Sequence, residues 1–439
     1  MLDHLLGLRV PRYQHTTGAT TPESLPFLGK LLVPLSNGED GWELKVKEGD
    51  QVKPGQVLSE HDRLGILVSS WQGTIEELKA LPDLYGHRTV ATAVVADPSE
   101  GTGLAGIDPQ TASVQELQDR LKEAGLFTSL GTSTALADPL PEPTGKPVGI
   151  LVVVAVDSDP MVSSTAHLLA TKPTDLARAT AMLKRLYNCQ RAVLAVPSPN
   201  IESTRQAASA AGIDVLGVPV RYPSGLPDLV ANSAGTGAMP IAAVTALQAL
   251  AAVEQGTLPT TVTLSLIGPD RKTVRLVSVP IGTPVQSVLK HAGITINELD
   301  KVVAGGPMRG IALPETGIGV SAGMTALTVI PANDISPWTN EPCINCGSCI
   351  RACPVNLQPH LLGKCAEYDL FSQAGELSIE ACLECGLCAA VCPAHRPLVQ
   401  WIRLARAEEH KRLQQEVAQA LEQAGIPESS DEPEEALHD

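Results

Sequence analysis

Cysteines recur at short, regular spacing near the C-terminus, first in Cys343-Ile-Asn-Cys346-Gly-Ser-Cys349-Ile-Arg-Ala-Cys353-Pro354. The same spacing returns in Cys382-Leu-Glu-Cys385-Gly-Leu-Cys388-Ala-Ala-Val-Cys392-Pro393, displaced by 39 residues at every cysteine. Nine of the ten cysteines lie between Cys343 and Cys392. A secreted disulfide scaffold would scatter its cysteines through a short chain, so this clustering favours a reducing compartment.

These spacings are typical of thiolate ligands to [4Fe-4S] clusters. Two residues between cysteines let three consecutive thiolates surround one corner of a cubane, and the fourth, followed by proline, reaches the other cluster in two-cluster ferredoxins. The small residues Gly347, Ser348 and Gly386 let the backbone approach the sulfides. The sequence therefore predicts two clusters with crossed ligands: cluster 1 is held by Cys343, Cys346, Cys349 and Cys392, and cluster 2 by Cys382, Cys385, Cys388 and Cys353.

Structural zinc is the alternative for these cysteines. Zinc sites usually join two short cysteine hooks in one tetrahedron, whereas here four cysteines followed by proline occur twice. Cys365 fits neither spacing and is interpreted as a spare thiol, and Cys189, which follows an amphipathic stretch, as an inert core thiol. Two matched redox centres in series indicate a module that passes electrons.

Composition sets the class of the whole protein. At 439 residues the chain is too long for one core, and with 44% hydrophobic but only 3% aromatic residues its cores consist mainly of Val, Leu, Ile and Ala. A net charge of −16 argues against general nucleic-acid binding. Neither the N-terminus nor the apolar run 238–253 has the pattern of a signal peptide or a membrane span, so the predicted protein is soluble or peripheral to a membrane.

Two different patterns divide the chain up to residue 258. After an N-terminal extension, residues 1–28, residues 29–98 alternate apolar and polar side chains around the turns Gly49-Asp50 and Pro54-Gly55, which is typical of a barrel-sandwich hybrid. No lysine stands at a carrier hairpin tip, so a structural use of this unit is favoured over a swinging arm. Between residues 102 and 258 helical and apolar strand stretches alternate, which predicts an α/β domain with a mostly parallel sheet.

The remaining chain predicts three segments. Residues 259–331 return to short strands with one helical stretch, which suggests a small β-grasp unit. Residues 336–410 hold the cysteines in an α-helical, two-cluster ferredoxin-like module. Residues 411–439 contain the end of a long helix and an acidic tail free of aromatic residues, which predicts disorder.

With the cysteine module placed, the chain resembles RnfC, the iron–sulfur subunit of the ion-translocating Rnf complex, over roughly residues 29–410. The segments that carry the resemblance are Cys353-Pro-Val-Asn-Leu357, Cys392-Pro-Ala-His-Arg-Pro-Leu-Val-Gln400, Val33-Pro-Leu-Ser36, Arg221-Tyr-Pro-Ser-Gly225 and Gly305-Gly-Pro-Met-Arg-Gly310. The resemblance implies an RnfC-type N-terminal domain at 29–98, a domain similar to the flavoprotein subunit of respiratory complex I at 102–258, and a β-grasp domain of the SLBB type at 259–331.

One segment departs from the family. Where the family carries a glycine-rich flavin loop similar to Gly-Gly-Ala-Gly-Phe-Pro-Thr, this chain has Leu130-Gly-Thr-Ser-Thr-Ala-Leu-Ala-Asp138, with one glycine. A phosphate cradle needs several backbone N–H groups that can come close, which glycine permits. The family segment Glu-Cys-Glu-Pro-Tyr is here Asp157-Ser-Asp-Pro-Met161. The degenerate flavin site, Gly131, Thr132, Ser133, Asp157 and Asp159, predicts no bound FMN and no NADH oxidation by this chain alone.

The resemblance implies an electron-relay subunit of a membrane-associated Rnf-type oxidoreductase, peripheral on the cytoplasmic side and not a complete enzyme by itself. Its expected partners are the other Rnf-type subunits and a soluble electron carrier such as ferredoxin, with no nucleic acid. A soluble RnfC-like reductase subunit, such as a microcompartment cobalamin reductase, is the alternative, although that class should keep its flavin loop. A third interpretation is an assembly protein whose residues 102–331 only bind partners.

Overall fold

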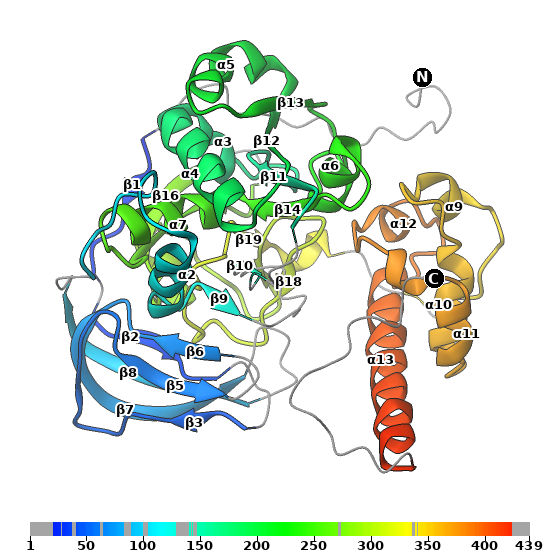
Figure 1. Cartoon of the computed structure of the whole chain (residues 1–439). Coiled ribbons are helices and arrows are strands. Elements are labelled where there is room, and N and C mark those ends of the chain that lie inside the picture. The colour runs from blue at the N-terminus through cyan, green and yellow to red at the C-terminus, as the bar shows by residue number, and fades with distance from the viewer. Residues whose placement is uncertain are drawn as a thin grey trace. The chain divides into compact units, whose positions relative to one another are not determined.

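The structure is a computed structural model of the chain (Figure 1). It describes residues 21–27, 29–36, 41–61, 65–82, 89–99, 104–128, 140–141, 143, 147–270, 274–335, 339 and 341–423. Most of the N-terminal extension, the loop 130–138 and the acidic tail therefore lie outside the described residues. The described residues form two compact units, one within residues 10–335 and one within residues 336–439. The chain is a multidomain protein of mixed α and β structure, as the sequence predicted.

Two antiparallel sheets occupy residues 31–99. One sheet has the order β2-β8-β7-β4 and the other the order β3-β5-β6. Leu35, Val52, Leu58 and Ile75 form a shared buried cluster, since apolar residues alternate with polar ones along these strands. The strands are Leu31–Pro34 (β2), Glu43–Leu44 (β3), Gln51–Val52 (β4), Val57–His61 (β5), Gly65–Val68 (β6), Gln72–Pro82 (β7) and Thr89–Ser99 (β8).

A parallel sheet of order β13-β12-β11-β14 forms the next part of this unit. Leu151 and Val153 of β11 belong to one buried cluster and Val152 and Val154 to another, so both faces of the sheet are covered, as its nearly continuous apolar strands require. The strands are Ile150–Val154 (β11), Arg191–Pro197 (β12), Asp214–Val218 (β13) and Met239–Ala242 (β14). The helices are Val114–Glu123 (α2), Ser164–Thr171 (α3), Pro173–Leu186 (α4), Ile201–Ala210 (α5), Pro227–Ala234 (α6) and Ala243–Glu254 (α7).

The order of this sheet marks one position for binding. Strands β12 and β14 lie on opposite sides of β11, so the chain reverses its direction of winding there. In open α/β sheets, ligands bind outside the carboxyl ends of the strands at such a point. Asp157 and Asp159 follow the carboxyl end of β11. A short parallel pair, Phe127–Thr128 (β9) and Leu140–Pro141 (β10), flanks the undescribed loop.

The last part of this unit is a six-stranded mixed sheet of order β1-β16-β15-β19-β17-β18. Val285, Val288 and Leu289 of the helix Val285–His291 (α8) share a buried cluster with the sheet, because apolar residues recur on one face of this helix. The strands are Glu23–Ser24 (β1), Thr261–Ile267 (β15), Val274–Pro280 (β16), Lys301–Ala304 (β17), Ile311–Ala312 (β18) and Ala326–Ile330 (β19). The sequence did not predict that β1, from the N-terminal extension, joins this sheet.

The C-terminal unit is helical and internally repeated. Helices α9 and α12 begin 39 residues apart, and so do helices α10 and α13. Helix α10 packs against helix α13 (Figure 1). Leu362 of α10 and Ile402 of α13 are fully buried in the shared core. The helices are Ser348–Ala352 (α9), Pro359–Glu367 (α10), Phe371–Glu376 (α11), Leu387–Ala390 (α12) and Leu398–Gln423 (α13). Single 3₁₀ turns occur at Ser198–Asn200, Ala332–Asp334 and Ile379–Ala381.

Candidate iron–sulfur centres

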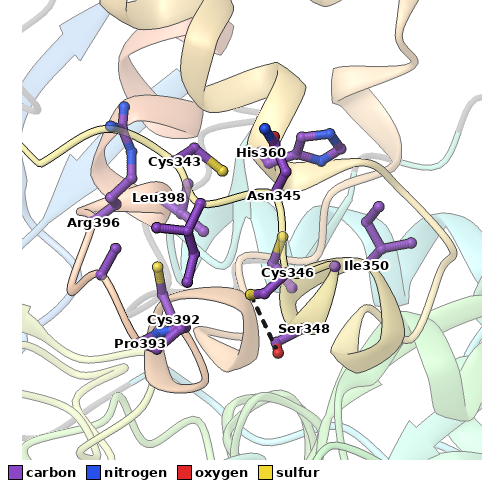
Figure 2. A pocket seen from close by; sticks show the side chains of 14 residues that line it. Cys343, Asn345, Cys346, Ser348, Ile350, His360, Cys392, Pro393, Arg396 and Leu398 are labelled. Atoms are coloured by element: carbon purple, nitrogen blue, oxygen red, sulfur yellow. Dashed lines mark hydrogen bonds between the residues drawn. The ribbon is translucent and has the colours of Figure 1, made fainter.

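One pocket of the C-terminal unit is lined by cysteines from both motifs. Cys343, Cys346 and Cys349 come from the first motif and its helix α9, and Cys392 comes from the end of the second motif (Figure 2). We call these four residues the first cysteine set. His360 and Arg396 also line this pocket. The structure therefore brings together the four residues that the sequence assigns to cluster 1.

The backbone of each motif has the same unusual conformation. Asn345 and Gly347 have φ values of 54° and 72°, and their equivalents 39 residues later, Glu384 and Gly386, have 49° and 77°. Positive φ turns successive backbone N–H groups toward one side of the loop, where they can donate to sulfur or to an anion. Gly347 and Gly386 then act as the N-caps of α9 and α12, which places Cys349 and Cys388 in the first turns of these helices.

The second cysteine set comprises Cys353, Cys382, Cys385 and Cys388. Burial raises the pKa of Cys382 and, to about 11, that of Cys385, and the nearby thiol of Cys353 raises both further. Cys353 of the first motif thus lies beside cysteines of the second. The sulfur of Cys353 accepts a hydrogen bond from the backbone N–H of Leu357 at 3.3 Å, and that of Cys382 accepts one from Glu384 at 3.4 Å.

Both sets offer donors that suit iron. Iron–sulfur clusters are held by cysteine thiolates, so the cysteine thiols must lose their protons on binding, and hydrogen bonds to sulfur tune the reduction potential of the cluster. The described loops supply four cysteines to each set, with backbone N–H groups aimed at Cys353 and Cys382. Among the described residues, no group of three or more His, Cys, Asp or Glu side chains is arranged to hold a single metal ion.

Charged networks that sequence reasoning missed support the two loops. Glu384 accepts hydrogen bonds from Arg403 at 2.6 Å and from Arg406 at 2.9 Å, which ties the second motif to α13. Arg396 is only 3% exposed, donates to Glu367 at 2.5 Å and lies with its guanidinium carbon 4.4 Å from the ring centroid of Trp401. A position-by-position comparison of the two motifs would have singled out Arg396 and Glu384, because their equivalents are Leu357 and Asn345.

The other two cysteines lie in apolar cores. Cys365 of α10 packs in the core of the C-terminal unit, and Cys189 packs in the core of the parallel sheet. Burial raises the pKa of both thiols, so both stay protonated at neutral pH. Neither lines the pocket of the first set.

The two carboxylates that the resemblance assigns to the flavin site, Asp157 and Asp159, accept hydrogen bonds from the backbone. Asp157 accepts hydrogen bonds from the N–H groups of Thr165 and Ala166 in α3, at 2.8 and 3.0 Å. Asp159 accepts from Met308 and Arg309, at 3.0 and 2.7 Å. Burial raises the pKa of both carboxyls to about 6, against the effect of these hydrogen bonds. Gly131, Thr132 and Ser133 lie outside the described residues, so the structure does not place them beside these carboxylates.

The C-terminal unit matches a known protein family, and most of the chain is similar to known proteins. The family model described as "4Fe-4S dicluster domain" matches residues 342–396. The chain is 26% identical over 385 residues to a subunit of the proton-translocating ferredoxin:NAD(+) oxidoreductase complex of Clostridium ljungdahlii, covering 83% of this chain and 84% of that protein. It is 27% identical to a subunit of the Na(+)-translocating ferredoxin:NAD(+) oxidoreductase complex of Acetobacterium woodii, covering 83% and 87%.

Other matches are less complete. A subunit of the ion-translocating oxidoreductase complex of Haemophilus influenzae is 26% identical over 91% of this chain, which spans 65% of that relative's length. In all three complexes the matching subunit has the letter C, as RnfC does. Among solved structures, an NAD+-reducing [NiFe]-hydrogenase in the H2-reduced state matches with a TM-score of 0.44 and 13% identity over 75% of this chain and 70% of that one.

The cysteine pattern and the matching family model indicate the class of this protein. Its C-terminal unit contains a 4Fe-4S domain, and the chain is an iron–sulfur protein. Over most of its length it is similar to the RnfC-type subunits of ion-translocating oxidoreductase complexes, so the resemblance to RnfC is confirmed. None of the helices in the described ranges has the length and apolar character needed to cross a bilayer.

Proposed function

We propose that this chain is the electron-relay subunit of an Rnf-type complex and holds two [4Fe-4S] clusters, one in each cysteine set. The observation that carries the proposal is the pocket lined by Cys343, Cys346, Cys349 and Cys392, because it unites residues from both motifs. A cluster, when bound, accepts and releases single electrons. Crossed ligands keep two such centres close together, which suits a relay and not a storage site.

Residues of this chain fix the conformation of both cysteine loops. Residues with positive φ stand at the same two positions of each loop, and the short helices α9 and α12 hold the third cysteine of each motif. Arg403 and Arg406 hold the second loop against α13 through Glu384. This preorganisation limits how far the sulfur ligands move when the charge of a cluster changes.

The proposed partners follow from the relatives. Proteins similar over most of this chain are named as subunits of proton- or sodium-translocating ferredoxin:NAD(+) oxidoreductase complexes. We therefore infer that the chain lies beside membrane subunits of such a complex, peripheral on the cytoplasmic side, where it exchanges electrons with a soluble carrier such as ferredoxin. In this arrangement the N-terminal barrel-sandwich hybrid, the complex I flavoprotein-like domain and the SLBB-type domain connect the clusters to the rest of the complex.

Iron and sulfide analysis tests the central proposal. The anaerobically reconstituted chain should hold about eight iron and about eight acid-labile sulfide atoms, as two cubanes require. Both should be measured on the same sample by colorimetric assay, with zinc measured by atomic absorption. About two zinc atoms without sulfide would contradict the proposal and favour structural zinc.

A second expected result concerns flavin. The chain should not retain FMN near one per chain, because burying a phosphate requires several donors and the loop 130–138 has one glycine and no lysine or arginine. Asp157 and Asp159, which the resemblance places at the flavin site, accept hydrogen bonds from the backbone instead. Without flavin, hydride transfer from NADH has no route into one-electron clusters.

The measurement is incubation of the cluster-loaded chain with excess FMN, followed by desalting, flavin assay and addition of NADH. Dithionite, which reduces clusters directly, serves as the positive control. Near one FMN per chain together with bleaching of the clusters by NADH would contradict this prediction.

A further inference from the structure

The two cysteine sets have different surroundings although their backbones match. Each residue of the first motif has an equivalent 39 residues later, so the two surroundings can be compared position by position. Cys346 of the first set is exposed to solvent, whereas its equivalent Cys385 is 8% exposed. Exposure to water, positive charge and hydrogen bonds to sulfur all favour the more negative, reduced form of a cluster.

The hydroxyl of Ser348 and the guanidinium of Arg351 lie close to Cys346. The Oγ of Ser348 lies 3.5 Å from the sulfur of Cys346, as the dashed line in Figure 2 shows. Arg351 donates to this Oγ at 3.1 Å and to the carbonyl oxygen of Cys346 at 3.1 Å. Because Ser348 accepts from Arg351, its own proton is available to a sulfur ligand. The second motif has Leu387 and Ala390 at these positions, which provide neither a side-chain donor nor a charge, so the hydrogen bonds to Cys353 and Cys382 of the second set come from backbone N–H groups.

A second guanidinium reaches the first set from the other motif. Arg396 lines the pocket of the first set and is almost completely buried. Its charge is partly offset by Glu367, whose side chain is 31% exposed, compared with 4% for that of Arg396. The equivalent of Arg396 in the first motif is Leu357. The first set therefore has two nearby guanidinium groups and one partly solvated carboxylate.

Charges at the second set are balanced. Arg406 donates to the carbonyl oxygen of Cys382 at 2.6 Å, so this set also has a nearby cation. Arg403 and Arg406 are both paired with Glu384, which lies inside the second loop where the first loop has Asn345. The carboxylate oxygen Oε2 of Glu380 also lies 3.8 Å from Nε of Arg406. Two guanidinium groups thus face two carboxylates here, and one of these carboxylates belongs to the loop itself.

We propose that, of the two clusters of the proposed function, the one held by the first cysteine set has the higher midpoint potential and is reduced first. The electron then rests beside the exposed Cys346, where Ile344, 64% exposed, also faces solvent. The second set, with Cys385 and Cys388 buried, holds the lower-potential cluster. Ser348 and Arg351 act as positioning residues for the potential and not as ligands.

A redox titration of the full reconstituted chain, followed by electron paramagnetic resonance, tests this assignment. Wild type should show two separated one-electron steps. Ser348→Ala and Arg351→Ala should shift the higher step to lower potential and leave the lower step in place. Glu384→Gln should shift the lower step upward. Lys411→Ala, which removes an exposed cation of α13 outside both motifs, should leave both steps unchanged.

The outcomes separate this inference from the proposed function. Iron and sulfide are measured first on each sample, and a wild type without clusters contradicts the proposed function itself. Two clusters with coincident steps, or a Ser348→Ala variant that shifts the lower step or neither step, overturn only the assignment of potentials. If Arg351→Ala loses iron, Ser348→Ala decides alone, because it keeps every cysteine and every charge.

Discussion

Replacing Cys392 by serine should remove the cluster that we propose for Cys343, Cys346 and Cys349, although Cys392 belongs to the second motif. Cys392 lines the pocket of the first set, and a serine hydroxyl is a much poorer iron ligand than a thiolate. Cys353→Ser should damage the other cluster, because Cys353 lies beside Cys382 and Cys385. Each variant should retain about half of the iron, near four atoms per chain.

Paramagnetic resonance spectra of the reduced variants, with iron and sulfide analysis, identify which cluster remains. Cys365→Ser is the matched control, because this buried cysteine of α10 lies in the same core but outside both sets, and its iron content should equal that of wild type. The crossed assignment is wrong if Cys353→Ser loses the signal that Ser348→Ala perturbs and keeps the other.

Removing the Asp159 carboxylate should lower the stability of the N-terminal unit by about 2–4 kcal/mol, since two backbone N–H groups lose their partner. Asp159 is 4% exposed and joins the end of β11 to Met308 and Arg309, about 150 residues further along the chain. Gly306 packs against it so closely that an added Cβ would lie 2.4 Å from the Asp159 side chain. The Asp159 carboxylate therefore fills the space beside Gly306, and its removal leaves the two N–H groups without their acceptor.

Calorimetry at pH 7.5 checks this prediction. The midpoint of the unfolding transition of the N-terminal unit should be roughly 3–6 °C lower in Asp159→Ala than in wild type. Asp214→Ala provides the control, because Asp214 is 61% exposed and its pair with Arg191 lies on the surface. Equal midpoints for Asp159→Ala and wild type would show that Asp159 does not stabilise the link to Met308 and Arg309.

The sequence predicted what depends on local pattern. The alternating α and β stretches indicated the parallel sheet, since apolar runs such as 150–154 are buried on both faces. The repeated cysteine spacing predicted that Cys392 joins Cys343, Cys346 and Cys349, and these four side chains line one pocket.

Other features depend on how distant segments pack, which no local pattern contains. The approach of Arg396 to the first set results from the packing of α13 on α10, and the pairing of β1 with β16 joins residues about 250 positions apart. The sequence also did not predict that Asp157 and Asp159 accept hydrogen bonds from backbone N–H groups, because the position of a carboxylate in the sequence does not indicate which N–H group lies next to it in the fold.

The crossing of the two motifs has a consequence for biosynthesis. Cys343 and Cys392 are 49 residues apart, and the pocket that they share does not exist while the chain ends between them. Cys353 likewise meets Cys382 and Cys385 only after the second motif has been made. A ribosome-bound chain that ends before Cys382 therefore presents four thiols in a row without a complete site. The second cysteine set gains its last thiol at Cys388 and the first set at Cys392, so the two proposed clusters have their full sets of ligands only late in translation.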